Sequence, residues 1–124
     1  SLSKSRVGRV LVAAPVQPGV LTALRQRDVR IVLLNNHLVH ASVGLVACDQ
    51  RSAMAALVRR LHAAGHRRFA IVSGPPGSRV GRDRLDGAIS ALASGVTSLR
   101  VVRGDYTYAS GLSAVQEILA GGRP

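Results

Sequence analysis

Short apolar segments rich in Val, Ile and Leu alternate along the chain with segments in which apolar residues recur every three or four positions. The apolar segments have the length and composition of buried strands, and they occupy residues 7–13, 29–34, 43–47, 69–72 and 99–102. The intervening segments have helical spacing, with apolar positions at Val20, Leu21 and Leu24, at Met54, Leu57, Val58 and Leu61, at Leu85, Ile89 and Leu92, and at Leu112, Val115, Ile118 and Leu119. This alternation predicts an α/β fold made of parallel βαβ units.

One connection is too short to hold a crossover helix. Only eight residues, 35–42, separate the second apolar segment from the third, whereas parallel strands usually need a dozen or more. We therefore expect the chain to leave one sheet at this connection and to enter another. The sequence predicts two lobes, residues 3–47 and 48–124, each with too few strands for a doubly wound sheet, so we expect a fragment of a longer protein.

The charge is strongly positive, with 17 Lys and Arg residues against 6 Asp and Glu residues and a net charge of +11. The basic residues are spread along the chain, Trp is absent and aromatic residues make up 2%, so a basic stripe with stacking rings is not expected. No apolar run is long enough for a membrane helix, and no signal peptide is evident. The single Cys48 excludes an internal disulfide and favours the cytoplasm.

Polar side chains follow four of the expected strands, at the ends where parallel α/β sheets bind ligands. Asn35 follows the second strand, Asp49 the third and Tyr106 the fifth, while Arg84 lies in the segment after the fourth. An amide, a carboxylate, a guanidinium and an aromatic ring suit a neutral small molecule rich in hydroxyl groups. We therefore expect these four side chains to contact a ligand.

Three of these residues also have a purely structural interpretation. Asn35 could shape a turn together with Asn36. Asp49 could cap the helix that starts near Arg51, and Tyr106 could pack within its loop. The sequence alone leaves both interpretations open.

Arg84 is expected near the start of a helix, where the helix dipole disfavours a positive charge. Asp83 and Asp86 could neutralise it, which would give the arginine a structural role. A ligand with acceptor oxygens would give it a binding role instead.

Motifs for catalysis, metals and cofactors are weak or missing. Residues 74–78 lack the Gly-Lys-Ser/Thr of a phosphate-binding loop, and no Gly-x-Gly-x-x-Gly follows a strand. His37, His40 and Cys48 do not have a convincing zinc spacing, and His66 is placed to help close the helix that ends at Gly65. The sequence therefore predicts neither an enzyme nor a metal or cofactor site.

Three linked motifs resemble those of the LacI/GalR family of transcriptional regulators. Residues 61–75 resemble the stretch L-x-x-x-G-H-R-x-I-A-x-I-x-G-P, residues 84–88 resemble R-L-x-G-[FWY], and residues 104–111 resemble G-D-[FWY]-x-x-x-S-G. Residues 46–49 are similar to the strand end that carries a family Asp. Order and spacing are kept over residues 7–124, although Ala88 replaces the usual aromatic residue.

The resemblance implies part of a two-lobed, periplasmic-binding-protein-like (type I) core, which closes around a sugar or nucleobase effector in the cleft between its lobes. Arg84 matches the arginine that hydrogen-bonds the effector, Tyr106 the aromatic residue that stacks on it, and Asp49 the Asp that lines the cleft. Asn35 falls where many members have an acidic residue, so this chain lacks a negative charge there and the identity of the effector stays open. Gly8-Arg9 replaces the usual Asp-Gly of the first strand.

Most members of this family bind palindromic operator DNA as homodimers through an N-terminal helix-turn-helix domain. That domain is absent from this sequence, so the resemblance implies DNA binding only for a longer parent protein in the cytoplasm. Two alternatives stay open: an exported sugar-binding protein for transport, which shares the fold, and a flavodoxin-like nucleotide-binding domain or enzyme. The residues upstream of Val7 would distinguish the first alternative, through a signal peptide, from a regulator.

Overall fold

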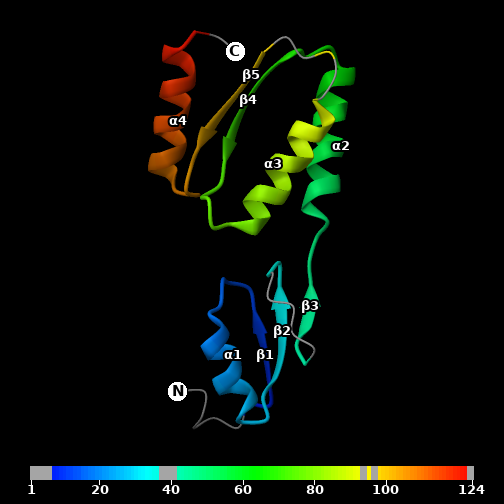
Figure 1. The fold of residues 1–124 in the computed structure, drawn as a ribbon, viewed down its shortest axis with the longest axis vertical. Helices are drawn as coiled ribbons and strands as arrows, with labels where there is room; N and C mark the ends of the chain where they lie inside the picture. The colour runs from blue at the N-terminus through cyan, green and yellow to red at the C-terminus, as the bar shows by residue number, and fades with distance from the viewer. Residues whose placement is uncertain (1–6, 37–41, 93–94, 96–97, 123–124) are drawn as a thin grey trace. The chain divides into compact units, whose positions relative to one another are not determined.

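The computed structural model describes residues 7–36, 42–92, 95 and 98–122, and the chain divides into two compact units, Ser1–Cys48 and Asp49–Pro124. All the strands and helices expected from the hydrophobic pattern are confirmed, and the fold is α/β with parallel strands (Figure 1). Along the chain they are β1 (Arg9–Val12), α1 (Pro18–Arg25), β2 (Arg30–Leu34), β3 (Gly44–Val46), α2 (Gln50–Ala63), β4 (Arg68–Ser73), α3 (Arg79–Ala91), β5 (Ser98–Arg103) and α4 (Tyr108–Ala120).

The first unit is a three-stranded parallel sheet in the order β1-β2-β3, with α1 packed on one face. Leu21 of α1 is buried against Ile31 and Leu33 of β2. Because side chains alternate across a strand, the register places Leu11 and Val46 on the opposite face. These two side chains are 70% and 61% exposed, so this face is apolar and open in the described chain.

The expected change of sheet between residues 34 and 43 is wrong, because β3 pairs in parallel with β2 in the same sheet. The physical reason is the length of β3, which has three residues and therefore spans only about 10 Å. Nine residues lie between Leu34 and Gly44, and such a segment reaches about 30 Å when extended. That is enough to return along so short a strand. The chain enters the second unit only after β3, at Asp49.

The second unit is built on the parallel pair β4-β5, with helices on both faces (Figure 1). Phe69 and Ile71 of β4 pack with α2 and α3, which lie side by side, while Val102 of β5 packs with α4. The buried residues are Val58, Phe69, Ala88 and Leu92 on the first face and Val102, Ala114 and Ile118 on the second. Because successive side chains of a strand point to opposite faces of the sheet, the second unit has a small hydrophobic core on each face of the β4-β5 pair.

Each helix of the second unit begins with a side-chain oxygen that accepts a backbone N–H three residues further on. Asp49 caps α2, Ser78 caps α3 and Thr107 caps α4, with oxygen–nitrogen distances of 3.0, 3.0 and 3.1 Å. Each cap lies in the short connection that follows a strand, three to five residues after the end of β3, β4 or β5.

The C-terminal ends of α2 and α4 account for the positions of Gly65 and Arg100. Gly65, with φ +96°, donates to the carbonyl of His62, and His66 donates to that of Leu61, so α2 ends where the sequence predicts. Arg100 donates from its two terminal nitrogens to the carbonyls of Ile118 and Gly121 at the end of α4, at 2.7 and 2.9 Å. A guanidinium at a helix C-terminus satisfies free carbonyls and complements the dipole.

Candidate functional site

Tyr106 is held over two glycines at the carboxyl ends of β4 and β5. Its hydroxyl lies 3.0 Å from the Ser78 hydroxyl, which at the same time accepts the N–H of Gly81. A Cβ added at Gly74 or Gly81 would collide with the Tyr106 hydroxyl, so a larger residue at either position would require the tyrosine side chain to move. Tyr106 has φ +69°, a left-handed conformation that is rare for an aromatic residue, yet the side chain is 61% exposed. Tyr106 therefore contacts the segment before α3 and its first turn rather than its own loop, and more than half of the residue stays exposed.

Asp105 fixes the backbone that carries Tyr106. Its carboxylate accepts the N–H and the hydroxyl of Thr107 at 2.9 and 2.6 Å, and its own N–H donates to the Ser110 hydroxyl at 3.1 Å. Hydrogen bonds from Ser110 and Thr107 lower the pKa of Asp105 from 3.8 to about 2. Sequence reasoning passed over Asp105, although an Asp two residues before a Thr is a signal for such a turn.

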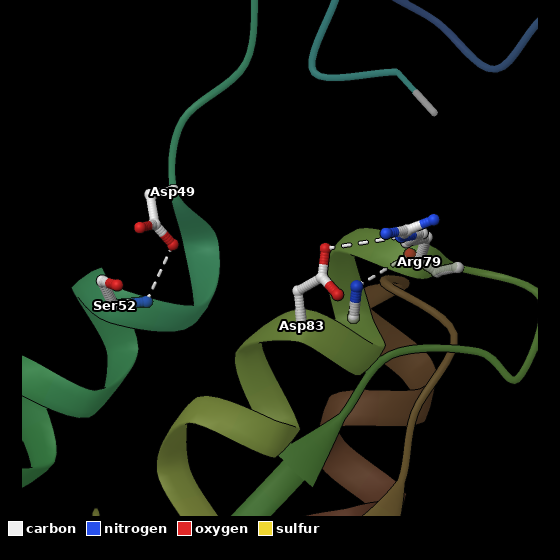
Figure 2. A network of polar contacts seen from close by, with 6 residues as sticks. Asp49, Ser52, Arg79 and Asp83 are labelled. Atoms are coloured by element: carbon white, nitrogen blue, oxygen red, sulfur yellow. Dashed lines mark hydrogen bonds and ion pairs between the residues drawn. The ribbon is translucent and has the colours of Figure 1, made fainter. Parts of the chain in front are cut away.

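Asp49 has the capping role that the sequence offered as one alternative. Its Oδ1 accepts the N–H of Ser52 at 3.0 Å (Figure 2). This hydrogen bond lowers the pKa of Asp49 below its ordinary value of 3.8, so the carboxylate is charged at neutral pH. The side chain is exposed, and a ligand contact by its other oxygen stays a prediction.

Arg84 lies farther into its helix than the sequence suggested. Helix α3 begins at Arg79, so Arg84 is its sixth residue, beyond the first turn where the dipole acts most strongly. Neutralisation by Asp83 was one of the alternatives left open by the sequence, and in the structure the carboxylate of Asp83 lies 3.9 Å from Nε of Arg79 (Figure 2). The Nε of Arg84 instead donates to Oε1 of Gln50, the first residue of α2, at 2.7 Å.

Asn35 closes the carboxyl end of the first sheet. It has φ +48°, its N–H donates to the carbonyl of Val46 at 2.8 Å, and its Oδ1 accepts the N–H of Cys48 at 3.1 Å. Nδ2 of the neighbouring Asn36 donates to the carbonyl of Ala14 at 3.0 Å. Asn35 therefore has a structural role, in which it joins the ends of β2 and β3, while a ligand contact by Asn35 stays a prediction.

A cavity of about 340 Å³ lies among α2, α3 and β4 of the second unit. Apolar side chains form most of its wall, and its polar side chains are Ser73 at the end of β4, Arg84 on α3 and Tyr106 in the loop after β5. The structure thus brings two of the four predicted site residues to one cavity, and Asp49 immediately precedes the Gln50 that contacts Arg84. Asn35 belongs to the other unit.

Within the part of the chain that the structure describes, no three His, Cys, Asp or Glu side chains are grouped so that they could hold a metal ion. His37 and His40 lie outside the described residues. None of the helices in the described ranges is both long and apolar enough to cross a membrane.

Comparison with known proteins gives a consistent picture. The sequence profile described as "Periplasmic binding proteins and sugar binding domain of LacI family" matches residues 1–124. The transcriptional regulator CelR of Thermobifida fusca, described as helix-turn-helix type, is 42% identical over 64 residues, which are 49% of this chain and 19% of that protein.

Two solved structures share the fold. A sugar-binding transcriptional regulator of the LacI family from Escherichia coli, in complex with phosphate, matches with a TM-score of 0.75 and 27% identity over 98% of this chain and 45% of that one. The periplasmic binding protein of an arabinose transporter from Shewanella sp. ANA-3, bound to arabinofuranose, has a TM-score of 0.80 and 20% identity over 99% of this chain and 45% of that one. The chain therefore spans about half the length of these structures, and the likeness extends over both of its units.

Proposed function

The chain belongs to the family of periplasmic binding proteins and LacI-type sugar-binding domains, and we propose that it is the effector-sensing segment of a transcriptional regulator. The observation that carries this proposal is the pairing of Arg84 and Tyr106 at one cavity, each held by a second polar side chain. A guanidinium beside an aromatic ring can hydrogen-bond the hydroxyls of a sugar and stack on its apolar face. The family binds ligands and regulates transcription, and we propose no catalytic step, metal or cofactor for this chain.

The proposed effector is a sugar-like molecule, with a nucleobase as the second possibility. Arg84 donates to its oxygens, Tyr106 stacks on its ring, and Asp49 accepts from its hydroxyls through Oδ2, while Oδ1 accepts the N–H of Ser52. Asn35 contributes its amide Nδ2. In this proposal residues 3–47 and 48–124 are parts of the N-terminal and C-terminal lobes of the effector-binding core.

We further propose that the full-length protein is a cytoplasmic homodimer that binds operator DNA through a helix-turn-helix domain outside these residues. The support is the 42% identity to CelR, which is described as a helix-turn-helix regulator. A sugar-binding protein for transport is the second candidate, because the arabinose-binding protein has the same fold. The regulator is favoured because its relatives are more similar in sequence, at 27% and 42% identity against 20%.

The test uses the full-length protein that carries this chain. Glucose, arabinose and their phosphate esters are titrated by calorimetry into the wild type, Arg84→Ala and Arg59→Ala, an exposed arginine on α2. Charge-assisted hydrogen bonds contribute about 1.5–3 kcal/mol each, so Arg84→Ala should weaken binding by about a hundredfold or more, and Arg59→Ala should not. An unchanged dissociation constant for Arg84→Ala would show that the site is wrong.

A second measurement separates the two candidate functions. The wild-type protein is mixed with a labelled duplex covering the region upstream of its own gene, at physiological salt and with competitor DNA. A regulator should bind this duplex tightly and change its affinity when the sugar is added. A protein that is exported after signal-peptide cleavage, and that ignores this DNA, would support the transport function.

A further inference from the structure

We infer that Gln50 is a positioning residue for the effector site, which holds the guanidinium of Arg84 so that its terminal nitrogens are left for the ligand. The inference rests on the proposed role of Arg84 as an effector contact. Its basis is the 2.7 Å hydrogen bond from Nε of Arg84 to Oε1 of Gln50, two residues that lie 34 positions apart. Gln50 is half-buried, whereas Arg84 is exposed, so the glutamine is the more fixed partner.

The backbone around Gln50 is held from two directions. Asp49 caps the helix immediately before it, through the N–H of Ser52. On the other side, a Cβ at Gly87 of α3 would collide with the carbonyl oxygen of Arg51, so the absence of a side chain at Gly87 lets the two helices approach closely. The separation between the first turn of α2 and helix α3 is thus set by the backbone, and the glutamine side chain spans it.

The hydrogen bond selects how Arg84 can meet a ligand. A guanidinium has five N–H donors, one on Nε and four on the terminal nitrogens. Because the Nε–H already donates to Gln50, a ligand cannot form the side-on pair of hydrogen bonds in which Nε and one terminal nitrogen both donate. The free arrangement is end-on, in which the two terminal nitrogens donate to a pair of neighbouring oxygens.

The partner is also neutral, which preserves the charge of Arg84. A carboxylate at position 50 would hold the same N–H but would offset the positive charge that strengthens hydrogen bonds to a ligand. The carboxylate of the adjacent Asp83 is engaged with Arg79. Gln50 therefore orients the guanidinium without neutralising it, which suits a ligand that presents two adjacent oxygens, as in a sugar diol or a phosphate ester.

The first arm of the test measures binding in the full-length protein. Glucose, arabinose and their phosphate esters are titrated into the wild type, Gln50→Leu, Gln50→Glu and a matched control, Gln116→Leu, which makes the same change at an exposed position of α4. Freeing a long side chain adds an ordering cost that corresponds to an affinity loss of about tenfold. Gln50→Leu should show this loss, and Gln116→Leu should bind as the wild type does. Gln50→Glu keeps the acceptor but offsets the charge of Arg84, so it should recover part of the binding of neutral sugars and less of the binding of phosphate esters.

The second arm needs no ligand. In protein labelled with ¹⁵N-arginine, the Nε–H of Arg84 should exchange slowly with water in the wild type and faster in Gln50→Leu and in Gln50→Ala, with thermal melts showing that each variant folds. Unchanged exchange in both variants would overturn the inference.

The outcomes also separate this inference from the proposed function. If Arg84→Ala abolishes sugar binding while Gln50→Leu and Gln50→Ala leave it intact, the positioning role is wrong and the effector role of Arg84 stands. If Arg84→Ala binds like the wild type, or the wild type binds none of the sugars, the proposed sugar site is wrong and the positioning role is overturned with it.

Discussion

Tyr106 owes its position to two glycines, so a single methyl group added at one of them should displace the ring without unfolding the protein. The prediction concerns Gly81→Ala in α3. Gly81 lies inside the helix with an ordinary backbone conformation, so alanine is compatible with the backbone, and the perturbation is confined to what the new Cβ meets.

The structure gives the size of each effect. A Cβ at Gly81 would lie 2.7 Å from the Tyr106 hydroxyl oxygen, so this oxygen must move by about 0.7 Å to reach an ordinary contact distance. A movement of that size is enough to break the 3.0 Å contact with Ser78. The lost hydrogen bond costs about 1 kcal/mol, while alanine in place of glycine within a helix stabilises by about 1 kcal/mol. The two contributions cancel, so stability should be nearly unchanged.

The displacement of the Tyr106 ring should instead raise the dissociation constant of the effector. An aromatic contact contributes about 1 kcal/mol, which corresponds to about fivefold in the dissociation constant. Calorimetric titration of the full-length protein would measure this, with Gly77→Ala as the matched control because a Cβ there meets nothing within 4 Å. Equal affinities for Gly81→Ala and Gly77→Ala, with unchanged melting temperatures, would refute the view that this packing places Tyr106 for a ligand.

Three further predictions concern the helix ends, the loop and the open faces. Asp105→Asn should flatten the pH dependence of the free energy of unfolding. In the wild type, folding lowers the pKa of Asp105 from 3.8 to about 2, so the carboxylate stabilises the fold at a pH above 3.8 and this stability is lost as the pH falls toward 2. Urea titrations between about pH 2 and pH 6 would measure the difference. Arg100→Ala should lower the free energy of unfolding by about 2 kcal/mol. Arg100→Lys should recover only part of this loss, because lysine cannot donate from two coplanar nitrogens to the carbonyls of Ile118 and Gly121. Chemical denaturation of both variants would measure these changes. The isolated chain should self-associate through the face that carries Leu11 and Val46, and a monomeric sedimentation profile at high concentration would contradict this.

The elements of the fold were predictable because their signals are local. The 3.6-residue period of α2 and its end at Gly65 depend on residues within one helix, and the structure confirms both. The assignment of β3 to a separate sheet was wrong because the usual length of a crossover applies to strands of ordinary length, and β3 has three residues. Pairing between strands is decided by contacts that no local pattern reveals.

The site was predictable only in part, for the same reason. The positions of Arg84 and Tyr106 beyond strand ends follow from the order of elements, and both reach one cavity. Their partners could not be predicted, because Gln50 lies 34 positions from Arg84 and Ser78 lies 28 positions from Tyr106. Which side chain meets which depends on how closely α2 approaches α3, and that distance is set by the glycine at position 87.

The structural and the binding interpretations of these residues are not exclusive, because each structural bond uses only part of a side chain. Asp49 caps α2 with one carboxylate oxygen and keeps a second one, and Arg84 gives one N–H of five to Gln50. Tyr106 uses its hydroxyl and keeps an exposed ring. A bond to one atom of such a group fixes the direction of the others, and this reduces the entropy lost when a ligand binds. The contacts that gave these residues a structural explanation are therefore the ones that would prepare them for an effector.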